Sequence, residues 1–522
     1  MAEPTLATFR RATPAGSAPQ IAVVGAGVAG LSAAIDLAHT GAQVTVIEGA
    51  ATPGGKMRTI EVAGRDVDSG PTVLTMRWVF DELFEAVGVA SPVAFVPAEV
   101  LARHAWMDGS RLDLFADVEA SVAAIAAFAG RAEGDAYRNF ARHTERIYRT
   151  VEGPFLRAQR PSFFGLVRDA VRGAASVTGL AQIDGMTTLW KTLAGTFHDP
   201  RLRQLFGRYA TYAGSSPFEA PGTLALIAHV EREGVHYVQG GMSALARGLE
   251  QVAKGLGVTF HYGERVRAIE ASGSKVSGVV TDARHLRVDA VVFAGDLATL
   301  ASGALGDVGV RAAGGYAFPV AKRSLSALTY SMVAQASGFP LARHNVFFSR
   351  DYAAEFRDLF QRGRLPEEPT VYVCAQDRDD TREPGPGEAE RLFMIVNAPA
   401  TGSATEVDRC EAAMNRVLET SGLSLRIEDR RRTTPADFEK LFPGTGGALY
   451  GLSSHGPMSA FRRPSARTPL GGFYVASGSA HPGAGVPMAA LSGRLAACAL
   501  REDFASTARF RTTATAGSIS IA

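Results

Sequence analysis

A glycine-rich loop near the start of the chain has the residue types and spacing that bind phosphate groups. Gly25, Gly27 and Gly30 follow the pattern Gly-x-Gly-x-x-Gly, directly after the apolar run 21–24. In this pattern the first glycine permits a tight turn, the second lets the backbone approach a pyrophosphate, and the third lets a helix pack against a strand. A helix that begins there would point free N–H groups toward the phosphates. The same spacing also occurs in ordinary glycine-rich turns, so the surrounding residues decide the interpretation.

Those surrounding residues favour a dinucleotide site. A helix is predicted over 29–40 and ends before Gly41, and a second apolar run over 44–47 ends at Glu48. An acidic residue about twenty residues after the loop, at a strand end, accepts hydrogen bonds from ribose hydroxyls. We therefore predict a β-α-β unit that binds a dinucleotide through the loop and Glu48.

A second glycine-rich segment indicates that the dinucleotide is FAD. Residues 53–59 contain two adjacent glycines and two cations, and a further tight segment follows at 70–72. NAD domains have no need of these segments, whereas the longer FAD molecule needs more backbone contacts along its pyrophosphate and ribityl chain. The expected contacts are Gly54, Gly55, Lys56, Met57, Arg58, Gly70, Pro71 and Thr72. The alternative is that both segments are unrelated hairpin turns.

With these residues the chain resembles a known family. From Gly25 to Arg58 it is similar to flavoproteins that include monoamine oxidases and carotenoid desaturases, and its carboxyl end resembles bacterial phytoene-desaturase-type enzymes. The sequence Met488–Ala496 is most similar to the branch of 1-hydroxycarotenoid 3,4-desaturases. The resemblance covers about 20–503, and the other segments that carry it are His198–Leu202, Gln239–Leu245, His455–Met458, Phe461–Pro464 and Gly478–Met488.

The resemblance implies an α/β fold with a discontinuous Rossmann-type FAD-binding domain and an interleaved α+β substrate domain that includes a helical membrane-facing region. It places the FAD-binding parts at 20–100, 236–300 and 441–504 and the substrate parts at 101–235 and 301–440. The segments 1–19 and 505–522 lie outside the resemblance, and their composition predicts flexible tails. It also implies that Val266 contacts the adenine through backbone atoms. Gly478, Gly485, Val486 and Pro487 would then lie near the pyrophosphate and the flavin.

The activity implied by the resemblance is FAD-dependent desaturation of an acyclic carotenoid, most closely the 3,4-desaturation of a 1-hydroxycarotenoid in carotenoid biosynthesis. A hydrocarbon offers no polar group to activate, so non-covalent FAD would accept a hydride at N5. His481 is the candidate catalytic residue, because it is the only titratable side chain in the turn 481–487. The alternative for His481 is a hydrogen-bonded turn residue. Three other functions stay open: a phytoene or neurosporene desaturase, a flavin amine oxidase, and a cofactor-bearing protein without redox activity.

The composition limits the partners. The formal net charge of +2 over 522 residues argues against a nucleic-acid partner, and three distant cysteines indicate neither a metal site nor a disulfide framework. No apolar run reaches the length of about 18 residues that a membrane-spanning helix needs. We therefore expect a cytoplasmic protein whose membrane association is peripheral. The lipid-stored carotenoid that the resemblance implies would place it at a bacterial inner membrane, with oxygen or a quinone as the electron acceptor.

The elements that must position these residues are partly visible. The patterns predict mainly helices over 100–235, short strands over 258–294 with turns at Gly263, Gly273 and Gly278, and mixed elements over 300–435. An exposed loop is expected at Arg382–Gly387, a strand at Gly472–Ala476 and a helix at Pro487–Leu500.

Three side-chain groups have two interpretations each. Aromatic, aliphatic and arginine residues alternate over 155–172, which suits either an anionic membrane surface or a packed amphipathic helix. Phe206, Tyr209 and Tyr212 share a helix face and could line an apolar tunnel or pack in the core. His229, on an apolar stretch, is expected to be a core histidine. A polar group that would meet the substrate's hydroxyl is not identified by the sequence.

Overall fold

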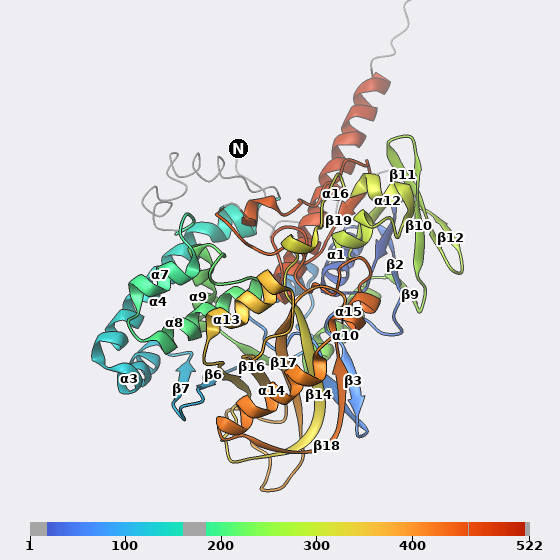
Figure 1. Ribbon diagram of the computed structural model, residues 1–522. Helices are drawn as coiled ribbons and strands as arrows, with labels where there is room; N and C mark the ends of the chain where they lie inside the picture. Colours follow the sequence, from blue (N-terminus) through green and yellow to red (C-terminus); the bar gives the residue numbers. More distant parts are fainter. Residues whose placement is uncertain (1–17, 160–183, 404, 458, 517–522) are drawn as a thin grey trace, which may run out of the picture.

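The computed structural model describes residues 18–159, 184–403, 405–457 and 459–516 (Figure 1). Its first layer is a five-stranded parallel sheet whose strands come from three distant parts of the chain. The order is β19–β13–β1–β2–β9, with β1 (Gln20–Val24), β2 (Gln43–Glu48), β9 (Thr259–Tyr262), β13 (Ala290–Phe293) and β19 (Phe473–Val475). The expected α/β fold with a discontinuous Rossmann-type sheet is confirmed.

Both faces of this sheet are covered, which is why its strands are continuously apolar. On one face Ile21 and Val23 pack against α1 (Val28–His39), α2 (Trp78–Val87), α10 (Met242–Gly255) and α16 (Val486–Ala516). On the other face Ala22 and Val24 share a core with the antiparallel sheet β10 (Val266–Ser272), β11 (Lys275–Thr281) and β12 (His285–Arg287), and with α11 (Leu297–Ala301) and α12 (Gly306–Ala312).

Gly278 corrects one turn prediction. It lies inside β11, opposite Glu270 of β10 and Arg287 of β12, and the chain turns after Thr281. A Cβ at Gly278 would stand 2.8 Å from the Glu270 carboxylate, which forms an ion pair with His285 across the sheet. The glycine therefore gives room for a cross-strand contact and does not mark a turn.

Helix α16 is longer than expected. It begins at Val486 and continues to Ala516, whereas the predicted helix ended at Leu500 and a tail was expected from 505 (Figure 1). Residues 501–516 contain neither glycine nor proline, so nothing in the sequence stops the helix. Near its start, Gly493 lets α16 approach α1 closely, because a Cβ there would stand 2.1 Å from the Ala29 carbonyl oxygen.

A second, seven-stranded sheet forms the other main layer. Its order is β18 (Ser424–Thr433), β14 (Ser326–Ser337), β17 (Glu390–Ala398), β16 (Val371–Ala375), β15 (His344–Phe347), β6 (Val100–Ala105) and β7 (Arg111–Phe115). One face packs against α14 (Val407–Thr420), and the other faces the helical region. Strands β6 and β7 correct the prediction of helices from 100 onward. They form a hairpin whose turn contains Asp108 and Gly109. Gly109 has a φ of 84°, which suits glycine in a tight turn.

The helical region covers that second face of the sheet (Figure 1). It consists of α3 (Val118–Ala129), α4 (Arg131–Val151), α7 (Leu189–Thr196), α8 (Pro200–Gly207) and α9 (Leu226–Arg232), with short turns η1 (Glu152–Leu156), η2 (Arg208–Ala213) and η3 (Gly222–Ala225). Asp199 caps α8 by accepting from Arg201 N–H at 2.8 Å, with Pro200 at the first helical position.

Smaller elements complete the chain. They are β3 (Thr59–Val62) with β4 (Arg65–Asp68), β5 (Phe95–Pro97) with β8 (His236–Val238), α13 (Tyr352–Phe356), α15 (Pro435–Leu441), η4 (Val320–Lys322), η5 (Arg357–Arg362) and η6 (Ser459–Arg462). The segment Arg382–Gly387 is exposed apart from a half-buried Pro384 and connects β16 to β17, as expected of a loop.

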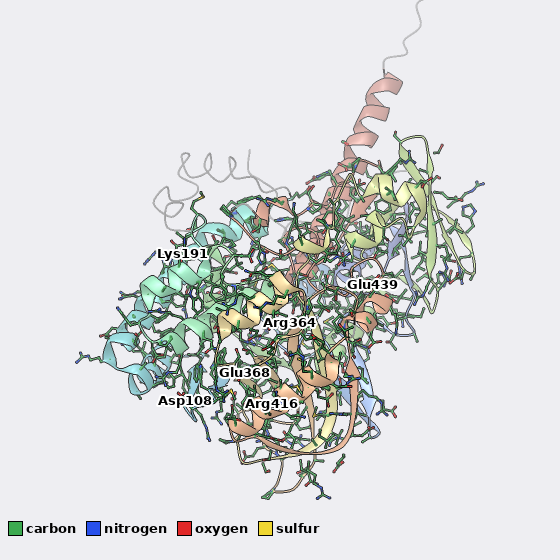
Figure 2. All side chains as sticks on the ribbon, in the orientation of Figure 1. Asp108, Lys191, Arg364, Glu368, Arg416 and Glu439 are labelled. Carbon is green, nitrogen blue, oxygen red and sulfur yellow. The ribbon has the colours of Figure 1, made fainter. Side chains whose placement is uncertain are left out.

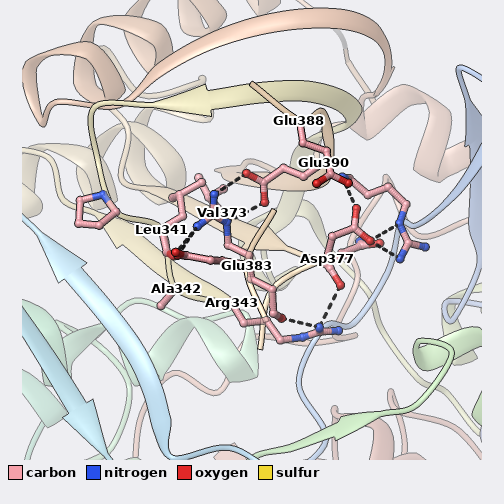
Figure 3. A network of polar contacts seen from close by, with 12 residues as sticks. Leu341, Ala342, Arg343, Val373, Asp377, Glu383, Glu388 and Glu390 are labelled. Atoms are coloured by element: carbon pink, nitrogen blue, oxygen red, sulfur yellow. Dashed lines mark hydrogen bonds and ion pairs between the residues drawn. The ribbon is translucent and has the colours of Figure 1, made fainter. Parts of the chain in front are cut away.

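A polar network ties β4 to the seven-stranded sheet. Asp377 accepts from Arg65 at 2.8 Å and from Arg391 at 2.6 Å, and Arg343 donates to backbone carbonyls beside it (Figure 3). The neighbouring Gln376 side chain bonds both backbone groups of Asp68, at 3.0 and 2.7 Å. The segment that follows Asp68 contains Gly70, so this network fixes a predicted cofactor segment against the second sheet.

Candidate active site

A cavity of about 1480 Å³ lies between the two main sheets. Ligand pockets typically measure roughly 300–1000 Å³, so this one has room for more than one drug-sized molecule. One part of its wall, the glycine-loop part, consists of the segments around Gly25, Gly54, Val266 and Gly478. The other, the aromatic part, is formed by residues of the helical region and the seven-stranded sheet, among them Arg208, Tyr212, Glu231, Tyr372 and Phe393.

In the first glycine loop each glycine meets a different requirement. Gly25 has a φ of 108° and donates its N–H to the Ile47 carbonyl at 2.8 Å. A Cβ at Gly30 would stand 2.0 Å from the Gly25 carbonyl oxygen, so helix α1 can approach the loop only with glycine there. A Cβ at Gly27 would meet nothing within 4 Å, and the residue lines the cavity. Since no side chain caps α1, its first N–H groups remain available for an anion.

Glu48 is held beside this loop by two backbone N–H groups. Its Oε2 accepts from Ala26 at 2.7 Å and its Oε1 accepts from Ala50 at 2.8 Å. The carboxylate lines the cavity, and each oxygen keeps a further lone pair for a ligand hydroxyl.

The second glycine loop contacts the first. Gly54 N–H donates to the Ala26 carbonyl at 2.9 Å, and a Cβ at Gly55 would lie 3.3 Å from Gly27 Cα. Both residues have positive φ, 121° and 58°. Gly70 packs against the second glycine loop. A Cβ there would stand 1.9 Å from the Lys56 carbonyl oxygen, so the contact requires glycine. Three segments that are separate in the sequence therefore form one continuous wall of backbone.

Lys56 and Arg58 line the cavity but are bound by the segment 433–449. Lys56 Nζ donates to the Leu449 carbonyl at 2.5 Å, and Arg58 donates to Thr433 Oγ1 at 3.2 Å. Burial lowers the pKa of both side chains, and the carboxylate of Asp296 opposes the shift at Lys56.

The carboxyl-terminal motif lines the cavity beside these loops. Gly478, Gly485, Val486 and Pro487 lie on the cavity wall, as does Val266 at the start of β10. Arg463 also lines the cavity; it donates to the Gly478 carbonyl at 2.9 Å and to the Tyr450 carbonyl at 3.2 Å, and burial lowers its pKa. The sequence marked Arg463 only as part of a motif, yet its guanidinium positions the turn that follows Gly478.

Nearly all the predicted cofactor residues are brought together on this wall. Those that line it are Gly25, Gly27, Glu48, Gly54, Gly55, Lys56, Met57, Arg58, Gly70, Pro71, Thr72, Val266, Gly478, Gly485, Val486 and Pro487. Gly30 lies behind the wall, between α1 and the first loop.

His481 is not on the cavity wall. Its Nε2 bonds the Ala158 carbonyl at 2.9 Å, and its ring packs edge-on against Phe155. Burial lowers its pKa to about 4, so the imidazole is neutral at pH 7. This geometry supports the alternative interpretation of a hydrogen-bonded turn residue and gives His481 no direct contact with a ligand in the cavity.

The aromatic part contains a polar cluster that the sequence did not indicate. Arg208 lies over the rings of Tyr212 and Tyr372, with 5.3 and 5.5 Å to the ring centres. Glu231 accepts from the Tyr212 hydroxyl, and all four residues line the cavity. Of the three aromatic residues expected on one helix face, only Tyr212 lines it, while Phe206 and Tyr209 are packed in the core.

Other predicted residues lie outside this wall. His229 is buried, bonds Arg232 through Nδ1 at 2.7 Å and has its pKa lowered to about 4 by burial, as expected of a core histidine. Cys498 lies in α16 beside Glu502 and is not on the cavity wall. Most of the patch 155–172 falls outside the described residues. In its described part, Phe155 and Leu156 line the cavity.

The described residues offer neither a metal site nor a membrane-spanning helix. They contain no group of His, Cys, Asp or Glu that could hold a metal ion. Within the same ranges, no helix combines the length and the apolar character needed to cross a membrane.

Comparisons with known proteins agree with this geometry. The sequence pattern of the family described as flavin containing amine oxidoreductase matches residues 28–501. The chain is 47% identical over 512 residues to the hydroxyneurosporene desaturase of Rubrivivax gelatinosus. This alignment covers 96% of this chain and 97% of that protein. It is 29% identical over 485 residues to the 1-hydroxycarotenoid 3,4-desaturase of Flavobacterium sp. (strain P99-3), over 91% of this chain and 97% of that protein.

A solved structure shows the same fold. Wild-type putrescine oxidase bound to putrescine superposes with a TM-score of 0.59 at 15% identity, over 93% of this chain and 99% of that one. The two chains therefore share a fold although their sequences differ widely.

Proposed function

This chain belongs to the family of flavin containing amine oxidoreductases, and from that premise we propose that it desaturates an acyclic carotenoid with FAD as the oxidant. We propose further that the substrate carries a hydroxyl on carbon 1 and that the new double bond forms between carbons 3 and 4. The observation that supports the proposal is a single cavity in which the glycine-loop part and the aromatic part are continuous. Two relatives whose names specify hydroxylated carotenoids support the choice of substrate.

The residues of the glycine-loop part fit FAD. Open space above Gly27 and the uncapped amino end of α1 suit a pyrophosphate, and Glu48 keeps acceptors for ribose hydroxyls. When bound, FAD supplies an oxidised flavin ring that takes a hydride from a C–H bond. Thr72 and the Gly478 turn, on the same wall, would hold the ring end.

The aromatic part orients the hydrocarbon and keeps it dry. Leu224, Ile227, Phe393 and Ile395 line it, so a polyene displaces water from apolar surface when it enters. Loss of a hydride from an allylic carbon to the flavin would leave positive charge that the substrate's own double bonds delocalise, and release of a proton from the neighbouring carbon to solvent would complete the new double bond. A wall without water protects this charge from hydration.

We also propose that the enzyme takes its substrate from a membrane surface and that oxygen or a quinone reoxidises the flavin. Met186 supports the first point, because it lines the cavity although 84% of its surface is exposed. An apolar side chain at the cavity opening suits contact with lipid. The enzyme should float with liposomes in a density gradient, and Met186→Asp should weaken this association; equal flotation of the variant would argue against an opening at the lipid surface.

The test of the proposed function is incubation with acyclic carotenoids in liposomes. Each carotenoid is supplied with and without a terminal hydroxyl, and products are identified by chromatography and by the red shift that added conjugation causes. We expect desaturation of the hydroxylated members. Desaturation of phytoene in their place would assign the chain to the phytoene desaturases.

A second measurement addresses the amine oxidase alternative. Flavin amine oxidases often hold their flavin covalently through a cysteine near the carboxyl end, but Cys498 lies within α16 and not on the cavity wall. Acid precipitation should therefore release the yellow colour into the supernatant, whereas a yellow pellet would support covalent flavin.

A further inference from the structure

A positively charged side chain lies inside the apolar chamber. Arg208 of η2 is half-buried, and it lines the cavity. Other charged side chains, such as Lys191 and Arg416, lie on the outer surface (Figure 2). A guanidinium does not lose its proton in a protein and carries five N–H donors. Such a group in an apolar wall needs polar partners to offset the loss of hydration.

The described residues place two tyrosine rings and a carboxylate around that charge. Arg208 lies over the rings of Tyr212 and Tyr372, and the carboxylate that influences its charge is Glu231. Glu231 already accepts from the Tyr209 hydroxyl at 2.7 Å and from the Tyr212 hydroxyl. Tyr212 therefore stands between the cation and the carboxylate, and the edge of the guanidinium has more donors than one tyrosine oxygen can satisfy.

The same cluster reaches the predicted flavin segment. The Tyr372 hydroxyl bonds Thr72 Oγ1 at 2.7 Å and His344 Nδ1 at 2.7 Å, while its ring lies beneath Arg208. Thr72 is one of the residues expected to contact FAD. Arg208 is thus separated from the cofactor wall by a single tyrosine.

This position matches the chemistry of a 1-hydroxycarotenoid. The hydroxyl on carbon 1 is two carbons from carbon 3, so it must bind close to the place where the hydride leaves. A polar group at the far end of the chamber could not reach it, whereas a group one residue from Thr72 could.

We propose that Arg208 and Tyr212 bind the hydroxyl of the substrate and that this contact decides between hydroxylated carotenoids and plain hydrocarbons. The inference rests on the proposed function and deepens it. Arg208 donates to the hydroxyl oxygen, and Tyr212, which shares Glu231 with Tyr209, fixes the position of the pair. A hydrocarbon end would cover the guanidinium without giving it an acceptor, and sites built to bond a hydroxyl reject analogues that lack it by as much as about 10⁴-fold.

The chain offers a matched control. Tyr209 and Tyr212 lie three residues apart and donate to the two oxygens of the same carboxylate, but only Tyr212 lines the cavity. Tyr212→Phe and Tyr209→Phe therefore each remove one tyrosine hydroxyl bond to Glu231. Only Tyr212→Phe also removes a hydroxyl from the aromatic part of the cavity wall. Arg208→Met keeps the length and apolar stem of the side chain and removes all its donors.

The experiment measures kcat/KM for a 1-hydroxycarotenoid and for the same carotenoid without the hydroxyl, in liposomes, with flavin content fixed by absorbance. We expect wild type to favour the hydroxylated substrate. Arg208→Met should lower that preference by about 10- to 100-fold, the value of a hydrogen bond to a charged group. Tyr212→Phe should lower it by roughly tenfold, and Tyr209→Phe should leave it unchanged.

The outcomes separate the two proposals. Wild type that desaturates no carotenoid overturns the proposed function. Wild type that desaturates both substrates equally, or an Arg208→Met enzyme that keeps the full preference, overturns the role of Arg208 alone. If Arg208→Met yields no folded flavoprotein, the ratio of Tyr212→Phe to Tyr209→Phe decides, since equal preference in these two variants would also overturn it.

Discussion

The two parts of the cavity are built on different principles. The glycine-loop part is a wall of backbone, in which Gly25, Gly30, Gly54 and Gly70 are required because a side chain would strain the loop or meet main-chain atoms. The aromatic part is a wall of side chains, brought together from η2, α9, β16 and β17. The first binds by shape and N–H groups, and the second selects through a few polar contacts in an apolar chamber.

This difference predicts different consequences of mutation. A backbone wall fails as a unit, because added atoms cannot be accommodated by a rotamer change. In a wall of side chains, a substitution removes the contacts of one residue, and the protein still folds.

Gly30→Ala should destabilise the protein most. The new Cβ would stand 2.0 Å from the Gly25 carbonyl oxygen, so either α1 or the loop must move. We expect a loss of at least about 3 kcal/mol of unfolding free energy, at the upper end for overpacking, together with loss of bound FAD. Thermal denaturation and the flavin absorbance of the purified protein measure both.

Two glycines serve as controls for this variant. Gly195→Ala in α7 should leave the stability unchanged or raise it by up to about 1 kcal/mol, because its Cβ would meet nothing within 4 Å and alanine favours a helix. Gly27→Ala should fold normally but hold FAD less tightly, since its Cβ enters open space on the cavity wall. A Gly30→Ala protein as stable as Gly195→Ala would show that the loop can relax.

The contrast also explains what could be predicted from the sequence. The glycines and Glu48 were found because their roles depend on neighbours a few residues away, in a strand–loop–helix pattern that is local. The hairpin β6–β7 carries only the turn signal Asp108-Gly109, and the helical patterns that follow it extend over a much longer stretch, so the sequence predicts helices from 100 onward.

The aromatic part was beyond such reasoning. The spacing of Phe206, Tyr209 and Tyr212 shows only that they share a face, and their separation into core and cavity depends on Glu231 and on the second sheet. Tyr372 lies 300 residues from its partner Thr72, so no local pattern connects them. His481 was chosen for its chemistry and its place in a turn, but its direction depends on Ala158 and Phe155, which the sequence does not relate to it.

Glu48→Gln should weaken FAD binding by about 10- to 100-fold, because two charge-assisted bonds to backbone N–H groups and the bonds to the ribose all weaken together. Titration of the protein freed of flavin with FAD, followed by fluorescence, measures the dissociation constant. Once saturated with FAD the variant should turn over normally. Glu61→Gln on exposed β3 is the control, and equal affinity in the two variants would remove Glu48 from the site.

His481 should make the protein less stable in acid. Its pKa is about 4 in the folded protein and near 6.5 when unfolded, so the unfolded chain takes up the proton first. Stability is then fully present above pH 6.5 and falls as the pH drops toward 4, by on the order of 2 kcal/mol between pH 7 and pH 5. Denaturant unfolding at a series of pH values measures the slope, and His481→Gln should flatten it.

His104, His229 and His344 have pKa values lowered in the same direction, so part of the slope remains in that variant. A pH dependence identical to that of wild type would show that His481 is protonated in the folded protein. Activity in the neutral range should not follow the titration of His481, because the residue is off the cavity wall.

The smallest effect is expected for Tyr372→Phe, at the junction of the two parts. The variant loses the bonds to Thr72 and His344 and leaves both ring nitrogens of His344 without a hydrogen-bond partner, for about 1 kcal/mol of stability. FAD should remain bound, because the backbone wall is unchanged. The ring beneath Arg208 is kept but is no longer held by the two hydroxyl bonds, so kcat/KM for the hydroxylated carotenoid should fall by roughly tenfold. Flavin content and turnover are measured on the same preparation. Loss of FAD in this variant would mean that Thr72 depends on Tyr372 for its place in the cofactor wall, and the two parts would then be one site and not two.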